Sequence, residues 1–127
     1  MRVKTTVIAV LLLAALATAL PAGAGARTIK VSEGDSIQDA IDAADPGDTI
    51  KIKPGTYAEN LFVNKDDITI KGSGASKTEL VPPSTPHPTC GADSGTVNGI
   101  CAADVDDQFN IVSPVENLKV KDLYVHG

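Results

Sequence analysis

Three aspartates near the end of the chain have the spacing of cation ligands. Asp104, Asp106 and Asp107 lie within a few residues of one another, and Asp93 precedes them on the same stretch. Ca²⁺ takes roughly six to eight oxygen ligands, and neighbouring carboxylates can supply several of them. The EF-hand pattern is absent, because no Asp-x-Asp-x-Asp-Gly run is closed by a glutamate. The aspartates therefore indicate either a calcium site or an acidic loop that is only hydrated.

The first 26 residues have the parts of a secretory signal peptide. Two basic residues precede an almost continuous apolar run over residues 7–20, and a small-x-small pattern ends at Ala24 and again at Ala26. The apolar run is shorter than the roughly 20 residues of a membrane span, so a cleaved signal is favoured over an anchor. Residues 1–26 are thus predicted to be removed, which leaves a secreted protein without a membrane span.

The chain has two cysteines, Cys90 and Cys101. In a secreted protein such a pair favours a disulfide. A disulfide that closes the short loop between these two residues would stabilise the fold by roughly 3 kcal/mol on the chain-entropy model. Zinc binding would need further ligands at a suitable spacing, and the sequence has none. The nearest imidazole, His87, lies between prolines and has no visible partner for a general-base role. We predict a Cys90–Cys101 disulfide.

The charge balance argues against one class of partner. The chain has 11 Lys and Arg against 16 Asp and Glu, and loss of the signal removes two of the basic residues. Such an acidic surface repels phosphate backbones, so nucleic acid is not an expected partner. An acidic secreted protein could instead hold cations.

One short helix and several short strands are expected after the signal. Ile37, Ala40, Ile41 and Ala44 fall on one helical face, with Asp35 or Ser36 as the N-cap. The aliphatic pair at 50 and 52 recurs at 68 and 70, and alternation resumes at 118–125. The predicted strands cover residues 28–31, 49–53, 60–63, 68–70 and 78–81, and a type II turn is expected at Pro54-Gly55. Such a series admits a sandwich, a barrel or a parallel β-helix.

The segment 37–61 contains I-x-x-A-I-x-A-A, then P-G-D-T-I-x-I and P-G-T-Y-x-E-N-L. This pattern resembles the opening of right-handed parallel β-helix proteins of the pectin-lyase-like superfamily. The resemblance implies an all-β fold, a right-handed single-stranded parallel β-helix solenoid with a short N-terminal capping α-helix. Residues 27–127 would form the N-terminal portion of that domain, and the domain is expected to be truncated at its C-terminus because 115–127 resembles an uncapped coil.

The superfamily contains pectate and pectin lyases, pectin methylesterases, polygalacturonases and non-enzymatic surface proteins, with site residues on middle coils. No residue of this chain matches those sets. The resemblance therefore implies the N-terminal part of a secreted polysaccharide-active protein, such as a pectate lyase-like enzyme, and this part is expected to be inactive by itself. The alternative is a non-catalytic β-helix protein that binds a glycan or a surface. The expected partner is an acidic polysaccharide or cell-surface glycan. No cofactor is evident, and Ca²⁺ is the one that a lyase-like full-length protein could use.

A pectin methylesterase-like carbohydrate esterase is a further alternative. Tyr57 and Glu59 match the opening coil of that family, but Gly72-Ser73-Gly74 departs from it because no acidic residue lies between the glycines. We expect Tyr57 to be a packed ring and Glu59 an acceptor that stabilises the turn. The irregular stretch 82–108, tied by the disulfide, would either line a groove or be a decorative loop.

Overall fold

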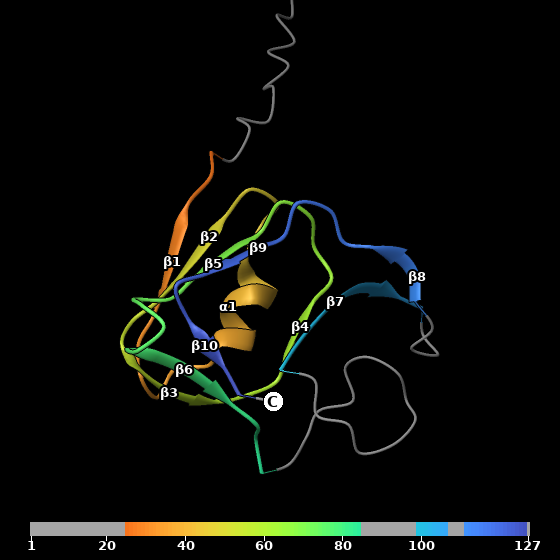
Figure 1. Ribbon diagram of the computed structural model, residues 1–127. Coiled ribbons are helices and arrows are strands. Elements are labelled where there is room, and N and C mark those ends of the chain that lie inside the picture. Colours follow the sequence, from red (N-terminus) through yellow and green to blue (C-terminus); the bar gives the residue numbers. More distant parts are fainter. Residues whose placement is uncertain (1–24, 85–98, 107–110, 127) are drawn as a thin grey trace, which may run out of the picture.

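The computed structural model describes residues 25–84, 99–106 and 111–126 (Figure 1). This part of the chain is mostly β, with one short helix. The elements are β1 (Thr28–Val31), α1 (Ile37–Ala43), β2 (Thr49–Ile52), β3 (Gly55–Ala58), β4 (Leu61–Val63), β5 (Thr69–Lys71), β6 (Thr78–Val81), β7 (Ile100–Val105), β8 (Ile111–Pro114), β9 (Lys119–Lys121) and β10 (Tyr124–Val125). None of the described residues lies in a helix long and apolar enough to cross a membrane.

The strands form three sheets, and nearly all the pairings are parallel. One sheet has the order β1-β2-β5-β9, a second β10-β6-β3, and a third β4-β7-β8. Among the described strands, only β7 and β8 pair antiparallel, with an irregularity between Asp104 and Val105. From β2 to β7, and again from β8 to β10, successive strands enter different sheets, so most parallel neighbours come from a later pass of the chain. This arrangement is compatible with a β-helix-like fold.

The core is a stack of aliphatic side chains between the sheets. Ile50 and Ile70 occupy matching positions on β2 and β5, and both are fully buried. The alternation seen in the sequence places these residues inward, because successive side chains of a strand point to opposite faces. α1 packs against β1, β2 and β4 and lies within the outline of the sheets in Figure 1. Its apolar face, with Ile37 and Ile41, is buried as the helical spacing predicts.

The two ends of α1 are bound by side chains that flank β4. The Glu59 carboxylate accepts hydrogen bonds from the Ile37 amide at 2.9 Å and the Gln38 amide at 3.1 Å. At the other end, Lys65 Nζ donates to the carbonyl oxygens of Ile41, Asp42 and Ala44 at 2.6 to 3.1 Å. An anion at the start and a cation at the end both oppose the helix dipole. Segment 59–65 therefore holds the helix in place.

Two sequence predictions of local structure were wrong. Gly55 begins strand β3, although Pro54-Gly55 had indicated a turn; Gly55 has a φ of 155° and its amide donates to Lys77 O, which starts the pairing of β3 with β6. Residues 100–105 form β7, although 82–108 had been predicted to be irregular. Pairing with a strand far away in the sequence stabilises both segments, and local propensity does not report such pairing.

Candidate functional site

The predicted calcium ligands are not gathered into a metal site in the described part of the chain. Asp104 and Asp106 are exposed, and Asp104 accepts a long hydrogen bond of 3.5 Å from Ser113 Oγ. Asp93 and Asp107 lie outside the described residues. Within 25–84, 99–106 and 111–126, no group of three or more His, Cys, Asp or Glu side chains could hold a metal ion. Calcium binding stays a prediction.

Only one of the two cysteines of the predicted disulfide lies among the described residues. Cys101 lies on β7 and is 3% exposed. Its predicted partner, Cys90, and the nearby His87 lie outside the described residues. The Cys90–Cys101 pairing therefore stays a prediction.

Tyr57 and Glu59 have structural roles. Tyr57 is 3% exposed, and its hydroxyl donates to Lys53 O at 3.0 Å. Burial, reinforced by the charge of Glu33, raises the pKa of the Tyr57 phenol. This confirms the expected packed ring. Glu59 is an acceptor, as predicted, but of the helix amides rather than of the turn, because the chain returns past the start of α1 after β3.

Every strand of the four-stranded sheet carries a lysine at the same register position. Lys30 on β1 pairs with Lys51 on β2, Lys51 pairs with Lys71 on β5, and Lys71 pairs with Lys121 on β9. We call Lys30, Lys51, Lys71 and Lys121 the lysine column. Their neighbours along the strands, such as Ile50 and Ile70, point into the core, so the lysines point away from it. Lys71 is half-buried and the other three are exposed.

A parallel column of hydroxyls lies beside the lysine column on the same outward face. Thr28, Thr49 and Thr69 are paired in register, and Lys119 occupies the equivalent position on β9. Five of the eight lysines that follow residue 26 thus lie on this one face. The four strands themselves contain no aspartate or glutamate. A protein with a net charge of −5 therefore presents one concentrated basic surface.

The positive charge of the lysine column is little compensated within the described chain. Among the described residues, the one ion pair made by these four lysines joins Lys71 Nζ to Asp122 Oδ2 at 4.0 Å, between half-exposed side chains. Neighbouring strands lie about 4.8 Å apart, so each column lysine has like charges on adjacent strands. Directly opposed like charges destabilise a sheet. The column can therefore gain stability from an external anion with a matching repeat.

Sequence reasoning missed this surface, although a signal for it was present. The tripeptide Thr-Ile-Lys occurs at 28–30, 49–51 and 69–71, and Lys-Val-Lys follows at 119–121. The inward isoleucines of this repeat had been used to predict the strands. The threonine and lysine on either side had not been recognised as a second, outward repeat.

Comparisons with protein-family models, with curated proteins and with solved structures give no match for this chain.

Proposed function

We propose that the chain is a secreted, right-handed parallel β-helix protein that binds an acidic polysaccharide along the lysine column. The observation that carries the proposal is the register of Lys30, Lys51, Lys71 and Lys121 across four parallel strands. Binding would rest on ionic attraction between the lysine ammonium groups and the carboxylates of the polymer. Hydrogen bonds from the neighbouring threonine hydroxyls would add to it. Binding needs no catalytic residue in this chain.

The β-helix proposal is supported by how the strands are connected. The pairs β1–β2, β2–β5 and β3–β6 are parallel, and each is linked by a segment that passes through another part of the fold. Such parallel crossovers are right-handed in about 98% of cases, because of the twist of the strands. A helix over one end of the stack protects its apolar side chains, as terminal caps of solenoids do. Secretion is proposed from the signal-like residues 1–26.

The geometry favours a linear polyanion that runs across the strands. Successive column lysines are spaced by the distance between strands, about 4.8 Å. A polyuronate has one carboxylate on every sugar, so consecutive carboxylates can meet successive ammonium groups. The sugar hydroxyls can exchange hydrogen bonds with the adjacent threonine column, Thr28, Thr49 and Thr69. The acidic charge elsewhere on the protein would direct the polymer to this face.

A merely hydrated surface explains the column less well. Solubility is served by charges of both signs interspersed on a surface. Here lysines of one sign are aligned in register on four strands, with no acidic residue among them. The alignment costs stability in the free protein and becomes favourable when an anionic chain is bound.

The test is a titration of the secreted protein with polygalacturonate, followed by calorimetry. Lys51→Gln is the informative variant, because Lys51 lies in the middle of the column and is exposed. We expect it to weaken binding about fivefold, or about 1 kcal/mol. Lys77→Gln removes the same charge from an exposed turn outside the four-stranded sheet and should leave the affinity unchanged.

Salt and competing polymers complete the experiment. Binding should be measurable at about 0.01 M ionic strength and lost at about 1 M, because the Debye length falls from about 30 Å to about 3 Å. A neutral polysaccharide should not bind. Equal effects of the two variants, or equal binding of a single-stranded oligonucleotide, would contradict the proposal.

A further inference from the structure

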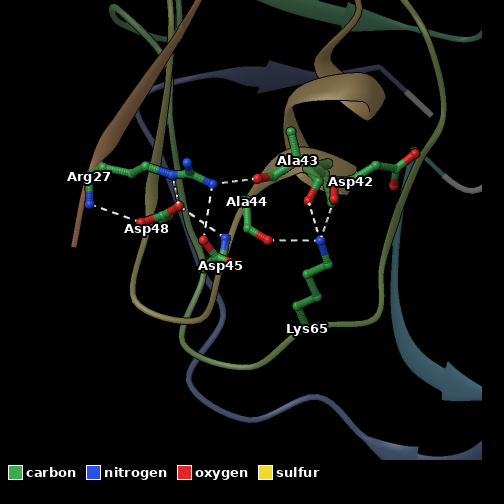
Figure 2. A network of polar contacts seen from close by, with 8 residues as sticks. Arg27, Asp42, Ala43, Ala44, Asp45, Asp48 and Lys65 are labelled. Carbon is green, nitrogen blue, oxygen red and sulfur yellow. Dashed lines mark hydrogen bonds and ion pairs between the residues drawn. The ribbon is translucent and has the colours of Figure 1, made fainter. Parts of the chain in front are cut away.

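The main-chain nitrogen of Arg27 lies against a buried carboxylate. The Arg27 amide donates to Asp48 Oδ1 at 2.9 Å, and the Arg27 Nε donates to Asp48 Oδ2 at 2.7 Å (Figure 2). Asp48 is 2% exposed. One residue therefore meets both oxygens of a buried acid, with its backbone on one side and its side chain on the other.

This carboxylate is held ionised by its surroundings. Hydrogen bonds from the backbone amides of Arg27 and Asp45, with the Arg27 guanidinium beside them, lower the pKa of Asp48 to about 2. The guanidinium also reaches Asp45, with Arg27 Nη2 at 3.1 Å from Asp45 Oδ2, and it donates to Ala43 O at 2.6 Å. Two carboxylates thus face one guanidinium at the C-terminal end of α1. The guanidinium compensates only one of these two negative charges.

We propose that the Ala26–Arg27 bond is the processing site of the precursor, and that the α-ammonium group released there binds Asp48. Hydrolysis by a signal peptidase adds one water: the carbonyl of Ala26 becomes a carboxylate, and the nitrogen of Arg27 leaves as an amine that takes up a proton. The neutral amide donor at Asp48 is thereby replaced by a cation. This inference rests on the proposed secretion of the chain and is independent of polysaccharide binding.

The position of the bond distinguishes two cleavage sites that the sequence leaves open. Cleavage after Ala24 would leave Gly25 and Ala26 ahead of Arg27, so the nitrogen at Asp48 would remain an amide. Both residues are exposed, and a Cβ built on Gly25 would have no neighbour within 4 Å. Little packing is lost when they are removed, whereas a charge pair with Asp48 is gained.

The other charges near the new terminus set its expected behaviour. Asp48 and Asp45 favour the charged amine, and the guanidinium of Arg27 itself opposes it. Lys65 is the next cation at this end of α1, and its Nζ is bound by three carbonyl oxygens of the helix terminus (Figure 2). Two carboxylates and one guanidinium lie next to the α-ammonium group. We therefore expect its pKa to lie above the usual α-amino range of about 7.7 to 8.0.

The first test is the N-terminus of the protein secreted from the full-length precursor, read by mass spectrometry. We expect the mature chain to begin at Arg27; a chain beginning at Gly25 would overturn the proposal. This measurement does not depend on the stability of any variant.

The second test is the reactivity of the α-amine in the mature chain. An amine-selective acylating reagent at pH 8 should modify Arg27 at least about fivefold more slowly in the folded protein than in urea. Asp48→Asn should remove most of this protection. The control is Asp122→Asn, which changes an exposed carboxylate next to β9, at the opposite end of the strand stack, and should leave the protection unchanged. Equal rates in the folded protein and in urea would show that Asp48 does not bind the terminus.

Discussion

The two ends of the strand stack differ in burial, although aliphatic residues occupy matching positions at both. Ile50 and Ile70, on the two middle strands, are fully buried and Ile29 at the first end is half-buried, whereas Val120, in the same column at the other end, is 42% exposed. α1 covers the first end, and no described segment covers the inward face of β9. The residue types are alike, so the difference comes from the layer packed on top. Inward register alone does not bury a side chain.

The polar contacts differ in the same direction. At the first end, Glu59, Lys65 and Asp48 each make two or more hydrogen bonds to backbone groups. At the other end, the ion pair between the described residues is long, with Lys71 Nζ 4.0 Å from Asp122 Oδ2, and Asp66 accepts one hydrogen bond from the Glu116 amide at 2.8 Å. We therefore expect substitutions in the buried layers and at the α1 end to cost much more stability than matched substitutions at the β9 end.

The largest difference is expected for truncation of the aliphatic column. Ile70→Ala should lower the free energy of unfolding by about 3 kcal/mol, because it removes a fully buried side chain and leaves a cavity. Val120→Ala should cost less than about 1 kcal/mol, since Val120 keeps much of its contact with water. Urea unfolding of the purified protein measures both values. Similar losses would mean that the β9 end is also covered in solution.

A smaller difference is expected for the carboxylate that binds α1. Glu59→Gln should destabilise the protein by about 1 to 2 kcal/mol, because a neutral amide binds the helix amides less well and no longer opposes the dipole. Glu116→Gln is the matched control, at an exposed residue near the other end. The same urea experiment applies. If Glu116→Gln destabilised the protein as much as Glu59→Gln, the hydrogen bonds to the helix N-terminus would not explain the effect of Glu59→Gln.

The smallest effect on stability is expected at low pH. The pKa of Asp48 is lowered to about 2, from a usual value of about 3.9, by hydrogen bonds from Arg27 and Asp45. The unfolded chain then binds more protons than the folded one, so stability falls as the pH drops from about 4 to about 2. Asp48→Asn should flatten this part of the stability profile, measured by thermal unfolding at each pH. Asp122→Asn should not, and a change of equal size there would contradict the assignment.

Much of the first end was predictable from the sequence because its signals are local. The spacing of Ile37, Ala40 and Ile41 determines a helical apolar face, and Ser36 is the N-cap that such a helix requires, accepting from the Asp39 amide at 3.2 Å. Strands β2 and β5 followed from alternation. Strands β3 and β7 did not, because their stability comes from pairing with distant strands rather than from their own residues.

The sequence by itself determined the repeat of Thr-Ile-Lys and hence the alternation of inward isoleucine with outward lysine. Only the tertiary structure decided that these lysines form a column, since β9 joins β5 across 50 residues of chain. The same holds for Arg27 and Asp48, which are 21 residues apart and meet only because β1 pairs with β2. Periodicity is a local property of strands, whereas register depends on the length and path of the connections between them.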